Sequence, residues 1–174
     1  DPDQVKQLTA QLLDFHRREQ RPLWWARFAW QDATTEELID DPECIGGLEI
    51  DPKIEPFREK RSMVFTYRFP VQETKLQFGN AVQIAETMIP AGTIFQLELD
   101  EGRIALKRGA AKGALPEALS ISPGPPINDR PLRRAILRFA DSVVQGSNRF
   151  GALRAILRRD IPNISGHDIG SSIV

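Results

Sequence analysis

Residues 63–70 read Met-Val-Phe-Thr-Tyr-Arg-Phe-Pro, and this stretch decides the fold. Every second position holds a large side chain with an apolar body: Met63, Phe65, Tyr67 and Phe69. Because successive side chains of a β-strand point to opposite faces, a period of two predicts a half-buried strand. Pro70 is expected to end the strand, since proline cannot donate to the hydrogen-bond ladder of a sheet.

Further short strands are predicted along the chain. Residues 93–99 and 103–108 also alternate, and Asp100-Glu101-Gly102 between them predicts the turn of a β-hairpin. Residues 76–84, interrupted at Gly79-Asn80, and residues 118–122 predict two more strands. About five to six short strands joined by tight turns, with no helices between them, favour a small antiparallel β-barrel of the SH3 or OB kind. Closure into a barrel also removes the exposed edges of so short a sheet.

Helical segments precede the predicted strands. Apolar residues recur at helical spacing over residues 4–18, which predicts a first helix. Pro22 is expected to end that pattern and to start a second short helix. Thr34 and Glu37 match a capping box at the start of a third helical turn.

Two further helices are predicted after the proline-rich linker at 122–126, one over residues 130–145 and a shorter one that Pro162 ends. The fold class expected is therefore α+β, a small antiparallel barrel flanked by N-terminal helices and a C-terminal helical pair. We expect the helices over 4–18 and 130–145 to pack together as a stalk. Their facing residues would be Leu8, Leu12 and Phe15 on one helix and Ile136, Phe139 and Val143 on the other.

These boundaries divide the chain into four segments. They are a helical connector with the first stalk helix at 1–47, the barrel at 48–124, the returning stalk helices at 125–160 and a flexible tail at 161–174. The chain begins at Asp1 without an initiator methionine. We therefore expect a piece cut from a longer protein.

The composition is that of a soluble globular protein, with 41% hydrophobic and 27% charged residues. No apolar run is long enough to span a membrane, and no signal peptide is visible. The single cysteine, Cys44, cannot form an internal disulfide, so a cytoplasmic location is expected. We expect this thiol to pack as a small apolar group beneath a helix.

Charge is distributed unevenly along the chain. Residues 1–100 carry 11 basic and 18 acidic residues, a net charge of −7, whereas residues 101–174 carry 12 and 6, a net charge of +6. Such asymmetry indicates contact with nucleic acid on the basic half. An equally weighted alternative is that solvated helix faces are simply rich in arginine.

The motifs of catalysis are incomplete. His16 and His167 have no second ligand at metal-binding spacing, and Glu73-Thr74-Lys75 matches only half of a metal-dependent nuclease site. Gly124-Pro125-Pro126 resembles the start of a phosphate loop, but the glycine and lysine that such a loop needs do not follow. We therefore expect no catalytic residue, no metal site and no cofactor in this chain.

Binding is the chemistry that the sequence favours. Guanidinium and ammonium groups suit phosphate oxygens, and three arginines spaced four apart would form a row on one helix face. The predicted nucleic-acid contacts are Arg103, Lys107, Arg108 and Lys112 in or near the hairpin and Arg130, Arg134 and Arg138 on the helix. The three tryptophans, Trp24, Trp25 and Trp30, could stack on bases, but core packing or contact with an absent neighbouring domain is favoured.

A series of short stretches occurs in the same order in a known class of protein. They are Leu12-Leu13-Asp14-Phe15-His16-Arg17-Arg18-Glu19, Pro22-Leu23-Trp24-Trp25 with Phe28, Asp40-Asp41-Pro42-Glu43, Ile45-Gly46-Gly47-Leu48, Tyr67-Arg68-Phe69-Pro70, Glu73-Thr74-Lys75-Leu76, and the region from Ala91-Gly92-Thr93 to Leu106-Lys107-Arg108-Gly109. In these stretches the chain resembles the connector of bacterial fusions between a RecB-like nuclease and a superfamily 1B helicase. The resemblance covers most of the chain.

The resemblance implies the accessory 1B region of the helicase, a small β-barrel on a stalk of two antiparallel helices that helps to grip nucleic acid. The family's nuclease motifs lie upstream of this region and its ATP-binding loop lies downstream, so ATP and magnesium are implied only for the parent protein. The implied partners are single-stranded nucleic acid, DNA rather than RNA, and the nuclease and helicase motor domains of the same parent chain.

The function expected is therefore non-catalytic binding and guiding of single-stranded nucleic acid through backbone phosphates. One alternative is a structural spacer that docks the nuclease onto the helicase without binding nucleic acid itself. Exposed Trp24 and Trp25 would indicate such a missing protein partner. A free-standing metal nuclease built on Glu73 and Lys75 is the least favoured reading.

Overall fold

The computed structural model describes residues 2–161 and divides the chain into two compact units. One unit combines the N-terminal stretch up to Arg21 with the stretch from Ile127 onward, and the other comprises Pro22–Pro126. Asp1 and the predicted flexible tail beyond Ile161 lie outside the described residues. No helix between residues 2 and 161 is both long enough and apolar enough to cross a membrane.

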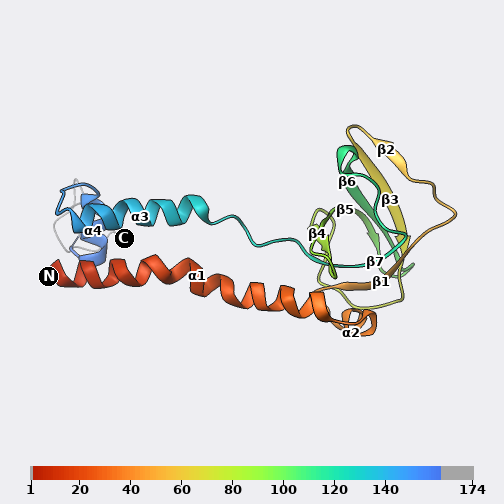
Figure 1. Ribbon diagram of the computed structural model, residues 1–174, viewed down its shortest axis with the longest axis horizontal. Helices are drawn as coiled ribbons and strands as arrows, with labels where there is room; N and C mark the ends of the chain where they lie inside the picture. Colours follow the sequence, from red (N-terminus) through yellow and green to blue (C-terminus); the bar gives the residue numbers. More distant parts are fainter. Residues whose placement is uncertain (1, 162–174) are drawn as a thin grey trace, which may run out of the picture. The chain divides into compact units, whose positions relative to one another are not determined.

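The N-terminal helix is longer than the sequence pattern predicts. Helix α1 runs from Pro2 to Asp32 without a break at Pro22, so the prediction of a separate second helix is wrong (Figure 1). Proline inside a helix removes one backbone donor and weakens the helix locally without obliging it to end. The capping box is confirmed at the next helix, α2 (Thr35–Asp40), where the Thr34 hydroxyl accepts from the Glu37 N–H and the Glu37 carboxylate accepts from the Thr34 N–H.

Arg27 anchors the second half of α1 to the barrel unit. The side chain is buried, and its Nη2 donates to the Gln83 side-chain carbonyl at 2.5 Å. Gln83 in turn donates to the Ser122 hydroxyl at 3.2 Å. Burial lowers the pKa of Arg27, but arginine remains charged at any physiological pH. Residues 22–32, predicted as part of a connector, therefore belong structurally with the barrel.

The barrel is confirmed as a closed antiparallel sheet of six strands. The ladder runs β1-β7-β4-β5-β6-β3 and closes through pairing of β1 with β3, while the extra strand β2 pairs with β3 alone (Figure 1). The strands are β1 (Ile45–Ile50), β2 (Phe57–Glu59), β3 (Ser62–Arg68), β4 (Ala81–Ile84), β5 (Pro90–Glu98), β6 (Arg103–Gly109) and β7 (Ala118–Pro123). The first strand thus begins three residues before the predicted boundary at residue 48. The strand predicted over 76–84 is confined to its last four residues.

The barrel interior holds the residues that the alternation pattern indicated. Phe65 and Tyr67 of β3 point inward and share one buried cluster with Ile104 and Leu106 of β6. The Tyr67 hydroxyl donates to the Pro116 carbonyl at 2.8 Å, which satisfies the one polar atom of a fully buried ring. Burial raises the pKa of Tyr67 to about 12. This phenol is therefore a structural group of the core.

The predicted hairpin is confirmed as β5 and β6, joined by the turn at residues 99–102. Gly102 adopts a left-handed conformation, and its carbonyl accepts from the Phe69 N–H at 2.8 Å. The register shifts between Ile94 and Gln96, where Phe95 forms a bulge. A bulge redirects the strand's side chains, and here it presents an aromatic ring on the outer face of the barrel.

The unit that includes the N-terminal stretch also contains two C-terminal helices, α3 (Arg130–Val144), close to its predicted limits, and α4 (Gly151–Arg158), which ends before Pro162. Phe139 is buried and meets Phe150 edge to face, with the ring centroids 5.9 Å apart. Of the predicted stalk residues, Phe15 is 44% exposed, while the others are buried or half-buried: Leu8, Leu12, Ile136, Phe139 and Val143. Val5 and Thr9, which the stalk prediction omitted, are more deeply buried on α1.

The loop between β1 and β2 is tied to β3 by a buried carboxylate. Asp51 accepts from Arg68 Nε at 2.8 Å and from the Lys53 N–H at 3.0 Å. The Asp51 N–H donates to the Thr66 carbonyl at 2.9 Å. Chiefly because of the Arg68 hydrogen bond, the pKa of Asp51 lies below its ordinary value. This loop carries Ile54 and leads into Phe57, which both line a pocket on the outer face of the barrel.

We expect the stabilisation from Asp51 to depend on pH. Its depressed folded-state pKa means that the unfolded chain binds the proton more tightly, so the contribution is full above the ordinary pKa near 4 and is lost as pH falls through the lower folded value. Urea unfolding of the wild type and of Asp51→Asn from pH 7 to pH 2 measures this. The difference in unfolding midpoint should be largest near neutrality and shrink below about pH 4. A difference that stayed constant would contradict the role assigned to this carboxylate.

Candidate nucleic-acid interface

Basic residues from two turns meet at one end of the barrel. The register places Arg58 of β2 across from Met63 of β3, and Met63 across from Arg108 of β6. The β2–β3 turn and the segment after β6, which includes the short helix η1 (Ala110–Lys112), are therefore neighbours. A hydrogen bond from the Ala110 N–H to the Arg61 carbonyl, at 3.1 Å, joins the two.

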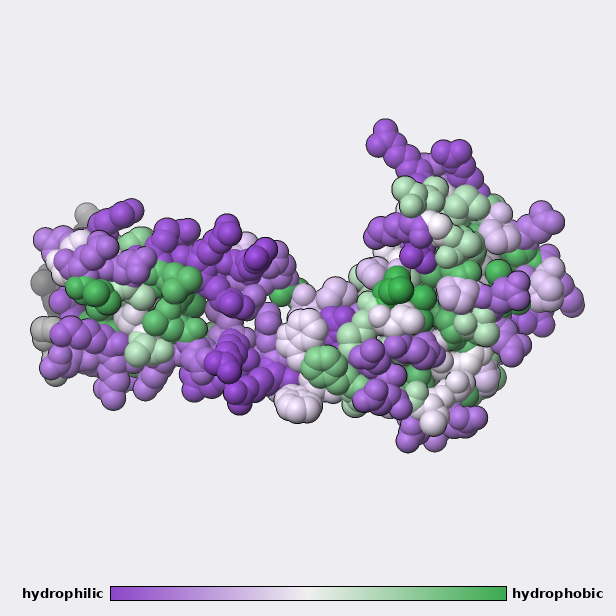
Figure 2. Space-filling model, viewed as in Figure 1, coloured by the Kyte–Doolittle hydropathy of each residue, from purple (hydrophilic) through white to green (hydrophobic). Residues whose placement is uncertain are grey.

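The charge at this end is strongly one-sided. Residues 57–62 and 107–113 contain six basic side chains and one acidic side chain, Glu59. Figure 2 shows hydrophilic side chains projecting at this end of the barrel, where Figure 1 places the β2–β3 turn. We call this cluster the basic end; it comprises Arg58, Lys60, Arg61, Lys107, Arg108 and Lys112.

Most cations of the basic end are accessible to a ligand. Arg58, Lys60, Arg61 and Lys112 are exposed, and within residues 2–161 none of the four forms an ion pair. Arg58 Nε donates to the Lys60 carbonyl at 3.1 Å, which orders the turn and leaves the rest of its guanidinium free to donate. Unpaired cations on a short rigid turn are suited to contact a polyanion.

Lys107 and Arg108, both predicted contacts, lie at this end but are half-buried. Lys107 Nζ lies 5.3 Å from the centre of the Phe95 ring, a cation–π contact that holds it on the outer face. Arg108 Nη1 lies 3.5 Å from the Ala114 carbonyl, and its Nε is buried without a partner among the described residues. Arg108 therefore offers less of its guanidinium to a ligand than the exposed cations do.

Arg103 lies at the opposite end of β6 and is already paired. Its Nη1 contacts Glu98 at 3.1 Å and Glu101 at 3.0 Å. Two carboxylates around one guanidinium oppose the approach of a phosphate. The structure thus separates Arg103 from the other predicted contacts of the hairpin.

The arginine row of α3 belongs to the other compact unit. Arg130, Arg134 and Arg138 are exposed, and in the described part of the chain none of them makes an ion pair, whereas the neighbouring Arg133 lies 3.9 Å from Asp129. Because it lies in a different compact unit, the row is a candidate surface separate from the basic end.

Three cations of the basic end were missed by the sequence reasoning. Arg58, Lys60 and Arg61 precede the strand that decides the fold, in a stretch that carries no alternation signal. Strand β2 is only three residues long and pairs at an edge, so its pattern is too short to detect. The run Arg58-Glu59-Lys60-Arg61 was the available signal, because a basic run before a predicted strand indicates a charged hairpin turn.

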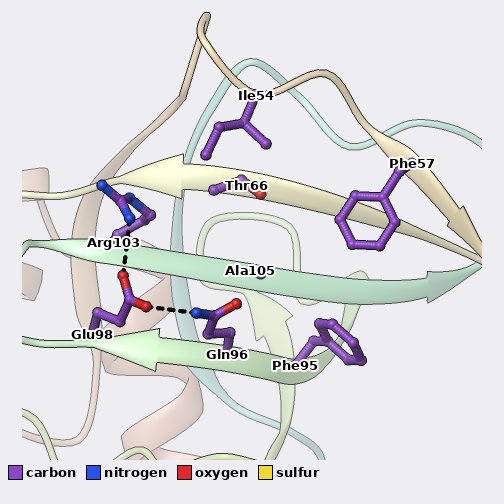
Figure 3. A pocket seen from close by; sticks show the side chains of 8 residues that line it. All are labelled: Ile54, Phe57, Thr66, Phe95, Gln96, Glu98, Arg103 and Ala105. Carbon is purple, nitrogen blue, oxygen red and sulfur yellow. Dashed lines mark hydrogen bonds and ion pairs between the residues drawn. The ribbon is translucent and has the colours of Figure 1, made fainter.

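A small pocket adjoins Lys107 on the outer face of β3, β6 and β5. Its volume is about 150 Å³, and Phe57 and Phe95 stand at one end while Arg103 and Glu98 stand at the other (Figure 3). The two phenylalanine rings meet edge to face with centroids 6.4 Å apart. The pocket exists because its floor carries short side chains, Ala105 and Thr66, between longer ones.

The three tryptophans have different surroundings. Trp24 and Trp25 are 41% and 71% exposed. Trp30 is half-buried against a cluster of Leu38, Cys44 and Ala85, and its indole N–H donates to the Asp41 carboxylate at 2.7 Å. Trp30 thus has a partner within this chain, and only Trp24 and Trp25 remain available to a neighbouring domain.

Lys75 of the incomplete nuclease motif is paired with a carboxylate from outside the motif. Lys75 forms an ion pair with Glu43 at 2.6 Å, which raises the pKa of the lysine, and Glu73 is exposed on the loop before it. Between residues 2 and 161 no group of three or more His, Cys, Asp or Glu side chains is placed to hold a metal ion. His16 lies edge to face with Phe15.

Cys44 should be inert toward thiol reagents in the folded protein. Burial, aided by the carboxylates of Asp41 and Glu43, raises the pKa of this thiol to about 12, and only the thiolate is an effective nucleophile. We expect no labelling by a maleimide at neutral pH and complete labelling of the single cysteine in denaturant, measured by intact mass. Rapid labelling of the native chain would contradict this placement.

Comparison with known proteins adds no further assignment. No family model, curated protein or solved structure matches the chain.

Proposed function

We propose that this chain is a non-catalytic accessory region that binds single-stranded nucleic acid through backbone phosphates at the basic end of its barrel. The observation that carries the proposal is the convergence of two segments that bring together six basic side chains and only one acidic one. Phosphate contacts fix the position of a strand and carry no sequence information directly. Binding would therefore be tolerant of sequence and sensitive to salt.

The geometry favours guiding a strand over reading one. The exposed cations Lys60, Arg61 and Lys112 stand on turns beside a rigid closed sheet, so their backbone positions are fixed while their side chains adapt. Single strands expose both phosphates and bases, which suits a turn-lined surface of this size.

The parent protein that we propose is the nuclease–helicase fusion indicated by the sequence resemblance. Its motor would use ATP and magnesium, and this region would hold the strand, DNA rather than RNA, between the nuclease and the motor. The α3 row of Arg130, Arg134 and Arg138 is a second proposed phosphate contact. Within residues 2–161 its guanidinium groups make no ion pair, which supports that role.

A docking role has its own supporting observation. Trp24, Trp25 and Phe28 are 41%, 71% and 48% exposed on one face of α1, where the rings of Trp24 and Phe28 lie 6.2 Å apart. Large apolar side chains that are grouped on a surface often mark a protein-contact site, whereas single exposed apolar residues are common on any protein. This patch favours attachment to another domain of the parent chain, and attachment is compatible with nucleic-acid binding at the basic end.

The test is titration of the 174-residue chain into labelled single-stranded DNA, followed by fluorescence anisotropy at low salt. The proposal expects saturable binding, and charge reversals at the basic end should weaken it. A chain that bound no single strand at low salt would leave the docking role as the function that the surface supports.

A further inference from the structure

The pocket on the outer face of the barrel combines an aromatic end with a polar end. Phe57 is 45% exposed, and Phe95 is held beside it by the bulge in β5. At the other end the Gln96 amide donates to Glu98 at 2.5 Å, and Glu98 accepts from Arg103 at 3.1 Å (Figure 3). A ring placed between these ends would meet an aromatic surface and a fixed hydrogen-bonding edge at once.

The volume of the pocket restricts its occupant. Sites for drug-sized ligands occupy roughly 300–1,000 Å³. This pocket has about 150 Å³, which suits one flat ring system entering over Ala105. Ile54 from the loop after β1 covers the side opposite Gln96, so the opening is a slot.

The charges around the pocket favour a neutral ring with a phosphate beside it. At the polar end, the charge of Arg103 is neutralised by Glu98 and Glu101, so an anion would not be stabilised there. Outside the aromatic end, Lys107 lies over Phe95, and Lys107 is itself part of the basic end. A nucleotide has this same division, an uncharged base joined to a charged backbone.

The Gln96 side chain offers a polar atom to an incoming base. The Gln96 side chain uses its nitrogen on Glu98, and its carbonyl oxygen is turned toward the aromatic end of the pocket (Figure 3). The imino and amino groups of bases donate to such an acceptor. Glu98 fixes the Gln96 amide in this orientation, so the acceptor is positioned before a ligand arrives.

We infer that the pocket formed by Phe57, Phe95 and Gln96 holds one unpaired base of a single-stranded nucleic acid whose phosphates lie on the basic end. The inference rests on the proposed function, because the strand must reach the barrel before a base can enter. Stacking on an aromatic side chain is tolerant of sequence, so it adds affinity to phosphate binding without imposing a motif.

The experiment compares two ligands of equal length and charge, an oligothymidylate and an abasic oligodeoxynucleotide that lacks every base. We expect the 174-residue chain to bind the oligothymidylate about tenfold more tightly, the effect of roughly one stacked base. Phe57→Ala should abolish that advantage and leave affinity for the abasic strand unchanged. Ala105→Ile, which fills the slot without removing an aromatic ring, should act in the same way.

The matched control is Phe78→Ala, a phenylalanine of the same unit that is 74% exposed and does not line the pocket. It should retain the preference for bases. Equal binding of the two ligands by the wild type, or a Phe57→Ala variant that keeps the preference, would overturn the base pocket while leaving phosphate binding intact. Failure of both ligands to bind would instead refute the proposed function.

Discussion

Gly92→Ala should strongly destabilise the folded barrel. A methyl group at this position would lie 2.3 Å from the Lys107 carbonyl oxygen and 2.9 Å from its carbon, both of them backbone atoms that cannot rotate away. Gly92 also has φ = +128°, a conformation that L-residues with a side chain rarely adopt. Backbone strain and overpacking each cost about 1–3 kcal/mol, so a combined loss of roughly 2–6 kcal/mol is expected against a total stability of about 5–15 kcal/mol.

Two other glycines separate the causes of this effect. Gly79 has φ = +82° but nothing within 4 Å of an added methyl group, and Gly109 has neither a positive φ nor a close neighbour. Urea unfolding followed by circular dichroism should rank Gly109→Ala as near neutral, Gly79→Ala as intermediate and Gly92→Ala as most destabilised. If Gly92→Ala were no worse than Gly79→Ala, the close approach of β5 to β6 would be contradicted.

Reversing two charges at the basic end should remove most binding to single-stranded nucleic acid. Arg61 and Lys112 stand on the two neighbouring turns, are exposed and make no ion pair within the described residues. In the double variant Arg61→Glu/Lys112→Glu, two phosphate contacts become repulsions. The slope of log affinity against log salt should decrease in magnitude by at least about 1.4, because each phosphate contact contributes roughly 0.7 to that slope for a single strand.

The control for this prediction applies the same change of charge elsewhere. Lys6 and Arg17 of α1 have side chains 65% and 73% exposed and lie outside both candidate surfaces. Lys6→Glu/Arg17→Glu should bind nearly as the wild type does. Equal weakening by both double variants would mean that net charge alone governs binding, and the basic end would lose its special role.

The sequence predicted the barrel because its signals were local and strong. The alternation from Met63 to Phe69 and the hairpin turn ending at Gly102 are patterns of a few residues, and both are present as expected. Pro22 misled, because proline weakens a helix without obliging it to end, and the half of α1 beyond it is held by Arg27 on Gln83, a contact 56 residues away in sequence. Closure of β1 on β3 likewise depends on long-range pairing that no local pattern contains.

The candidate site was predictable only in part. Lys107, Arg108 and Lys112 were found because basic residues are frequent in the C-terminal half, but the same criterion selected Arg103, which two carboxylates surround. Arg58, Lys60 and Arg61 come from the acidic half of the sequence and join the site only through the pairing of β2 with β3. The Phe57–Phe95 pair needs both that pairing and the bulge in β5.

The most direct test of the central claim is the salt dependence of binding to a single-stranded oligonucleotide, measured by anisotropy from about 50 to 200 mM salt. Four to six phosphate contacts at the basic end predict a slope of log affinity against log salt of roughly −3 to −4, or a loss of about 50- to 300-fold across that range. A flat dependence, or no binding at about 50 mM salt, would contradict the assignment of this surface to nucleic acid.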